Sequence, residues 1–166
     1  MTASLQGAPA DVSDATRFDP DIVLRGERPA DDAGIAALND AAFGPGRYAR
    51  TAYRIRERGG HDPRLPFVAV AGETLVASVR MSPIAIGGTA AWLLGPLAVA
   101  PERARRGIGR ALVRRALGAA DAAGGDPVLL VGDLAYYGPC GFRRADPASV
   151  RLPGPVEPGR LLLRIA

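Results

Sequence analysis

The chain has 166 residues, of which 48% are apolar, 23% charged and 5% aromatic. A chain of this length can bury a sufficient core without metal ions or disulfides, and its composition excludes a disordered or fibrous protein. The formal net charge is +4, and all 21 basic residues are arginine. Such a bias is typical of GC-rich bacterial genomes, so the charge permits an anionic ligand without indicating nucleic acid.

Cysteine and histidine each occur once, as Cys140 and His61. A single cysteine excludes an internal disulfide and a thiolate zinc site, and with histidine equally scarce we do not expect structural zinc or a histidine-based catalytic triad. The N-terminal residues lack the basic and apolar segments of a signal peptide, and no apolar run reaches the roughly 20 residues that span a bilayer. We therefore expect a cytoplasmic protein, a monomer or homodimer, with no metal ion and no membrane segment.

The first part of the chain predicts a tail, a strand and two helices. Residues 1–20 are small and polar without periodicity, which indicates a flexible tail, and residues 21–166 are expected to form a single domain. A short strand is predicted at 21–27. Asp31 is expected to cap the first helix, whose apolar positions are Ile35, Leu38 and Ala42. A weaker helical pattern follows, with apolar positions at Tyr48, Ala52 and Ile55.

The middle of the chain changes to the period of strands. Strands are predicted at 65–71, 75–82 and 89–99, joined by tight turns that contain glycine, so that they form an antiparallel meander. Apolar and polar residues alternate in the second strand, which favours one buried and one exposed face. Gly95-Pro96 interrupts the third strand. Because proline cannot donate to a strand ladder, this pair predicts a bulge or a kink at a sheet edge.

The last third of the chain begins with an amphipathic helix that ends at Gly124-Gly125. The apolar face of this helix consists of Ile108, Leu112, Val113, Ala116, Leu117 and Ala120. The run 128–131 is typical of a buried parallel strand. A helical turn near 134–138 and two strands, near Phe142 and at 160–165, complete an α+β domain.

The most informative stretch lies where the strand at 89–99 gives way to the helix. Arg103, Arg105 and Arg106 precede Gly107 and Gly109 at the helix start. Free N–H groups and the helix dipole favour an anion there, glycine lets it approach the backbone, and arginine adds donors. The stretch lacks the third glycine of a dinucleotide fingerprint and the lysine of a P-loop. It therefore predicts a phosphate-binding turn or, alternatively, an ordinary helix with a solvated basic face.

Two segments resemble the GNAT superfamily of N-acetyltransferases. They are LGPLAVAPERARRGIGRALV and, downstream, VLLVGDLAYYGPCGF. The resemblance extends from about residue 21 to the end and is closest to a bacterial branch with Tyr-Tyr before Gly-Phe. It implies a mixed, mainly antiparallel central sheet with flanking helices, in which the parallel strands 89–99 and 128–131 splay apart to admit the pantetheine arm of coenzyme A.

The resemblance also implies how acetyl-CoA is bound. The family turn reads Gln/Arg-x-x-Gly-x-Gly/Ala, and Ala104 stands where Gln or Arg is usual, so that Arg103 or Arg105 is left to supply this contact. Backbone amides of the turn hold the pyrophosphate, and the strand edge holds the pantetheine arm. The residues expected to bind the cofactor are Leu97, Ala98, Val99, Arg105, Arg106, Gly107, Ile108, Gly109 and Arg110.

By the same resemblance, Tyr137 matches the tyrosine that protonates the departing thiolate. A phenol suits this task because its pKa of about 10 keeps it protonated at neutral pH. Tyr136 is then expected to pack against Phe142. Asp133 is expected either to orient a water that takes the amine proton or to cap the next helical turn.

Two reactive residue types have simpler explanations. Cys140 has no histidine partner in its motif and is expected to pack as a small apolar residue. His61 lies in a predicted loop, where a solvated side chain is more common than a catalytic base.

The resulting hypothesis is an N-acetyltransferase that moves an acetyl group directly from acetyl-CoA to a primary amine. The acceptor is a small molecule or a peptide, and the resemblance implies that the segments 43–53 and 147–158 select it. The alternatives are a CoA-binding module that has lost transfer, in keeping with Ala104, and a basic nucleic-acid-binding protein, which lacks the motifs of that class.

Overall fold

The computed structural model describes residues 19–46, 51–57 and 62–166. Most of the predicted tail, Tyr48, Gly59-Gly60 and His61 lie outside these residues, so the predictions made for them stay predictions. The described helices and strands follow the expected order along the chain. They are β1 (Ile22–Gly26), α1 (Asp32–Phe43), α2 (Thr51–Glu57), β2 (Phe67–Ala71), β3 (Thr74–Ile86), β4 (Thr89–Val99), α3 (Ile108–Ala122), β5 (Val128–Val131), α4 (Leu134–Tyr137), β6 (Arg143–Arg144) and β7 (Leu161–Arg164).

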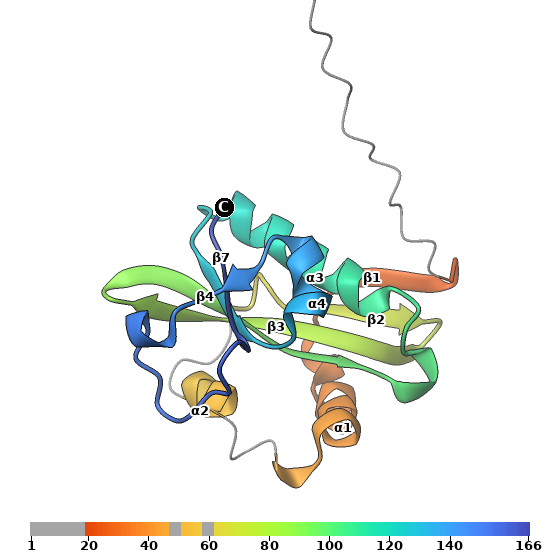
Figure 1. The fold of residues 1–166 in the computed structure, drawn as a ribbon. Coiled ribbons are helices and arrows are strands. Elements are labelled where there is room, and N and C mark those ends of the chain that lie inside the picture. Colours follow the sequence, from red (N-terminus) through yellow and green to blue (C-terminus); the bar gives the residue numbers. More distant parts are fainter. Residues whose placement is uncertain (1–18, 47–50, 58–61) are drawn as a thin grey trace, which may run out of the picture.

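The strands form one sheet in the order β1-β2-β3-β4-β5-β7-β6. All neighbouring strands pair antiparallel except β4 and β5, which pair in parallel. Helices α1 and α2 lie against one face of the sheet, and α3 and α4 lie against the other (Figure 1). The predicted α+β fold, with its mainly antiparallel sheet and its parallel β4/β5 pair, is confirmed.

The alternation in β3 was wrongly interpreted as the mark of a half-exposed strand. Both faces are buried: Val76 and Ser78 are as inaccessible as Ala77 and Val79. The physical reason is that α1 contacts β3 on one face of the sheet and α3 contacts it on the other. Ser78 is therefore a buried polar residue within a core strand.

The predicted bulge lies in the centre of the sheet. Val79 pairs with Leu97 and Met81 pairs with Leu94, so that Arg80 alone faces both residues of the Gly95-Pro96 pair. Beyond this bulge, β4 continues beside β3 only. Strand β5 pairs with β4 at two positions before the bulge, Trp92 and Leu93, so the parallel strands separate as predicted.

The start of α1 differs from the prediction. Asp31 immediately precedes the helix, but its carboxylate makes no capping bond to it. It accepts hydrogen bonds instead from the Arg25 guanidinium, at 2.7 and 2.9 Å, and from the Arg28 backbone N–H, at 2.7 Å. The hydrogen bonds from Arg25 hold the pKa of Asp31 at about 2, against the opposing effect of burial. Along the helix Ile35 and Leu38 are buried as expected, whereas Ala42 is exposed.

All six predicted apolar positions of α3 are buried against the sheet. Leu112 is completely inaccessible, and Leu112→Ala should therefore lower the free energy of unfolding by about 2–5 kcal/mol. Gly118 is exposed in the same helix with open space beside it, so Gly118→Ala should raise that free energy by roughly 0.5–1 kcal/mol. Urea unfolding of the two variants measures both values. Equal destabilisation by both changes would contradict this packing.

Candidate functional site

A cleft of about 1070 Å³ opens beside the point where β4 and β5 part. Its walls come from α1, α2, β3, the bulged part of β4, the end of β5, α4 with the two residues before it, and the segment before β7. The last of these segments runs beside α2 below the sheet (Figure 1), and Thr51 on α2 donates a hydrogen bond to the Pro155 carbonyl at 2.7 Å. The two segments expected to select the acceptor therefore meet at this cleft.

The predicted strand edge faces the opening. Leu97, Ala98 and Val99 pair with β3 on one side, and β5 does not pair with them on the other. Leu97 lines the cleft, whereas the Ala98 side chain is buried in the core. Only the backbone of Ala98 is therefore available to a ligand.

The predicted phosphate turn leads directly into α3. Gly107 stands at its N-terminal boundary with a φ of 78°, and Arg105 also has a positive φ, of 61°. The side chains of Arg105 and Arg106 are exposed, while Ile108 is 1% exposed and belongs to the core. Ile108 can therefore serve an anion only through its N–H group.

Arg103 does not replace the Gln or Arg side chain that the family usually has at the position of Ala104. Arg103 forms an ion pair with Asp19 at 3.0 Å, which directs its guanidinium towards the start of the described chain. Ala104 itself is exposed. Of the two arginines expected to replace the missing side chain, Arg105 is the one that the Asp19 pair does not engage.

Gly109 lies at the helix start, where the Tyr136 hydroxyl leaves no room for a side chain. A Cβ atom at Gly109 would collide with the Tyr136 hydroxyl and would lie 3.4 Å from Val99. The Arg110 guanidinium lies over the Tyr136 ring, 5.4 Å from its centre. Tyr136 thus connects the turn before α3 with the cleft, which it also lines.

The expected positions of the two tyrosines are partly wrong. Tyr137, and not Tyr136, packs against Phe142, with ring centres 5.9 Å apart and ring planes at 73°. Tyr137 also lines the cleft. A Cβ atom at Gly132 would lie 2.5 Å from the Tyr137 ring, so the absence of a side chain at Gly132 makes room for this ring. The physical reason for the error is that the turn of α4 directs Tyr136 towards α3 and Tyr137 towards the core.

Both phenols are held in their protonated form. Burial raises the pKa of Tyr137, and the neighbouring Tyr136 and Asp133 raise it further. Burial also raises the pKa of Tyr136, against the opposing effect of Arg110. Either hydroxyl can therefore donate a proton or a hydrogen bond at neutral pH, whereas a tyrosinate base is disfavoured.

Asp133 precedes α4, but its side chain makes no capping bond, so the capping interpretation is wrong. Its backbone carbonyl accepts from the N–H groups of Tyr136 and Tyr137, at 3.0 and 3.1 Å. The exposed carboxylate lies at the cleft and forms an ion pair with Arg160, with 3.3 Å between Oδ1 and Nε. Cys140 packs at the edge of the core, as expected of a small apolar residue.

Several residues that shape the cleft were not predicted. Gly132 is the partner of Tyr137, and its position between a buried strand and Asp133 is the only sequence signal for it. Arg56, Asn39 and Ser82 line the cleft with buried polar atoms that lack hydrogen-bond partners within the described residues. No spacing or motif distinguishes these three residues in the sequence.

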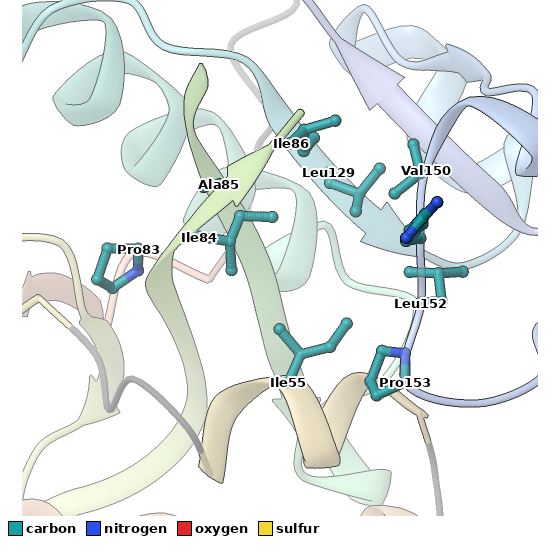
Figure 2. Close-up of a pocket in the computed structure, with 10 residues that line it drawn as sticks. Ile55, Pro83, Ile84, Ala85, Ile86, Leu129, Val150, Leu152 and Pro153 are labelled. Atoms are coloured by element: carbon teal, nitrogen blue, oxygen red, sulfur yellow. The ribbon is translucent and has the colours of Figure 1, made fainter. Parts of the chain in front are cut away.

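A second cavity, of about 260 Å³, lies between α2, the β3–β4 hairpin and residues 150–153. Figure 2 shows that its lining is almost entirely apolar, with Ile55, Ile84 and Leu152 facing one another. It lacks a group of polar side chains that could perform chemistry. The first cleft is therefore the candidate active site.

The chain belongs to the acetyltransferase (GNAT) family, and its fold is the fold of that family. The model of that family matches residues 34–142, which include most of α1, the bulge, the turn before α3 and both tyrosines. The sequence comparison with curated proteins finds no match.

Solved structures of this family are similar over most of the chain. A GNAT family N-acetyltransferase (YhbS) from Escherichia coli, in complex with CoA, is 28% identical with a TM-score of 0.73, covering 87% of this chain and 81% of its own. A GNAT family acetyltransferase from Brucella melitensis, in complex with acetyl-CoA, is 30% identical with a TM-score of 0.63, covering 87% and 96%. An Arabidopsis thaliana protein bound to the bisubstrate analogue CoA-Ac-MVNAL shares the fold at 18% identity, with a TM-score of 0.63, covering 88% and 99%.

Neither a metal-binding cluster nor a membrane-spanning helix occurs in the part of the chain that the structure describes. Within residues 19–46, 51–57 and 62–166, no three His, Cys, Asp or Glu side chains are grouped so that they could hold a metal ion. None of the helices in this same part of the chain has both the length and the apolar character needed to cross a membrane.

The contact between Gly109 and Tyr136 gives a testable coupling. Gly109→Ala should displace the Tyr136 ring and lower the free energy of unfolding by about 1–3 kcal/mol. Tyr136→Phe removes the colliding hydroxyl, so the double variant should lose less free energy than the sum of the two single losses. Gly118→Ala is the control, because its effect should add to that of Tyr136→Phe. An additive result for the Gly109 pair would show that the hydroxyl is not what excludes a side chain.

Proposed function

We propose that the chain is an acetyl-CoA-dependent N-acetyltransferase that transfers the acetyl group directly to a primary amine. The observation that carries this proposal is the alignment of three features: the turn at Gly107, the unpaired edge of Leu97–Val99 and the cleft beside Tyr137. The CoA and acetyl-CoA complexes of the two bacterial relatives support it.

The residues present fit acetyl-CoA along its length. The pyrophosphate would bind the N–H groups of the turn and of Ile108 and Gly109, where the helix dipole favours negative charge. The exposed side chains of Arg105, Arg106 and Arg110 would add charge-assisted hydrogen bonds. The free edge of Leu97–Val99 would bind the pantetheine arm in the manner of an added strand.

Acetyl-CoA supplies an activated thioester, and the chain's own groups would act around it. A backbone N–H near Leu97 would stabilise negative charge on the acetyl oxygen. Tyr137 would protonate the departing thiolate, and its raised pKa keeps the proton available. An amine with a pKa of about 10.4 is rarely neutral at pH 7. The exposed Asp133 carboxylate would take the amine proton through a water molecule.

The two tyrosines should differ in their kinetic effects. Tyr137→Phe keeps the ring against Phe142 and removes only the acid, so kcat should fall by about 10²–10⁴ with little change in acetyl-CoA affinity. Tyr136→Phe should lose much less kcat. Steady-state kinetics and calorimetry measure these quantities. If kcat falls in Tyr136→Phe and not in Tyr137→Phe, Tyr136 is the acid. If acetyl-CoA binds but no amine is acetylated, the chain is a CoA-binding module.

A second prediction separates a phosphate site from diffuse basic charge. Changing Arg105, Arg106 and Arg110 to Gln should weaken CoA binding by at least about tenfold. The affinity for pantetheine, which has no phosphate, should stay unchanged. Calorimetric titration measures both ligands. The control changes three exposed arginines elsewhere, Arg143, Arg144 and Arg151, to Gln. Equal losses of CoA affinity in both triple variants would refute a localised site.

A further inference from the structure

Arg56 is a cation that the described structure leaves without a counter-ion. It lies on α2 and lines the cleft, and its Nε atom is buried without a hydrogen-bond partner. No ion pair joins it to a carboxylate of the described residues, although Glu57 and Glu157 line the same cleft as exposed side chains. Burial lowers the pKa of Arg56 to about 10, and only Tyr53 acts in the opposite direction.

A second arginine in the same cleft provides a comparison. Arg80 is held by two carboxylates: its Nε donates to Glu27 at 2.9 Å and its Nη2 donates to Asp32 at 2.9 Å. These hydrogen bonds raise its pKa, although burial lowers it. Arg80 is therefore neutralised within the fold, whereas Arg56 is not. A desolvated charge costs free energy unless it is paired, so the missing partner of Arg56 is expected to come from a ligand.

The unpaired guanidinium lies next to the proposed reaction centre. Its Nη2 atom is 3.8 Å from the position that a Cβ atom would take on Gly95, within the bulge of β4. Ser82, whose strand neighbour is Leu93, is 2% exposed, and its hydroxyl also lacks a hydrogen-bond partner within the described residues. The Oδ1 atom of Asn39, in a side chain that is 7% exposed, lines the same cleft without a partner. An anion beside Gly95 would satisfy Arg56 in a cleft that the unpartnered Ser82 hydroxyl also lines.

We propose that the acceptor is a short amino acid whose carboxylate binds the Arg56 guanidinium, with Ser82 as an additional donor. This inference rests on the proposed acetyl transfer and names its substrate class. Arginine binds a carboxylate through two parallel hydrogen bonds, which fixes orientation as well as position. Because Arg56 lies against the bulge, next to the strand edge proposed to bind the thioester, the proposal favours a short separation between amine and carboxylate, as in an α- or β-amino acid.

The experiment compares matched acceptors that differ in one charge. Glycine, β-alanine, L-alanine, L-methionine and L-phenylalanine are each assayed for acetylation against the corresponding amide. At least one acid should exceed its amide in kcat/KM by about tenfold or more, since one charge-assisted contact is at stake. The amide's amine is more often neutral at pH 7, so amine reactivity alone favours the amide. The preference for the acid therefore reports binding of the carboxylate.

Variants of Arg56 test whether this residue causes the preference for the acid over the amide. Arg56→Gln should reduce the ratio of acid to amide to about one and leave acetyl-CoA affinity unchanged. Arg54→Gln, which removes an exposed charge from the same helix, should keep the ratio. Three results would overturn the proposal. The ratio of acid to amide could be near one for every pair in the wild type, it could stay unchanged in Arg56→Gln, or it could fall equally in Arg56→Gln and Arg54→Gln.

Two further measurements do not depend on turnover. Calorimetric titration of the same amino acids in the presence of CoA should detect binding that Arg56→Gln abolishes. If no amine is acetylated but this binding is found, the proposed transfer fails and the carboxylate site stands; absence of binding overturns the site. Arg56→Met removes an unpaired desolvated charge and should raise the unfolding temperature. A lowered temperature would assign Arg56 to the fold and overturn the proposal.

Discussion

The separation of β4 from β5 is the constraint on which the whole site depends. Two residues of β4 face the single Arg80 of β3, and such a bulge bends the strand that carries the extra residue. Strand β5 consequently pairs with β4 only at Trp92 and Leu93. A continuous parallel pair would satisfy the backbone groups of residues 97–99 within the sheet. The bulge leaves that edge available to a ligand and opens the cleft beside it.

Two glycines then determine how the tyrosines are arranged around this opening. Gly109 leaves room for the Tyr136 hydroxyl at the start of α3, and Gly132 leaves room for the Tyr137 ring after β5. Each glycine follows a different strand of the splayed pair along the chain. The separation of these strands therefore leaves one tyrosine beside the turn before α3 and the other against the core. Adjacent residues of a short helix acquire different environments in this way.

Sequence patterns predicted the features that depend on local periodicity. The apolar face of α3, the meander and the bulge at Gly95-Pro96 all follow from neighbouring residues, and the resemblance added the splayed strands. The errors concern tertiary packing. Alternation in β3 does not show that helices cover both faces, and the capping preference of Asp31 does not show that Arg25 captures its carboxylate. The packing of Tyr137 on Phe142 likewise depends on how the turn of α4 is oriented.

Arginine is so common in this chain that no count or spacing could distinguish Arg56 from the other 20. What distinguishes it is the balance of charge inside one cleft. The guanidinium of Arg80 is paired within the fold, because two carboxylates from other parts of the chain accept its hydrogen bonds. Arg56 costs desolvation free energy and receives no such compensation from the described residues. A buried guanidinium without a counter-ion among the described residues, beside the strand edge proposed to bind the thioester, is best explained by a carboxylate that the substrate carries. The free energy lost in folding is then recovered in binding, and only by molecules that carry the complementary charge.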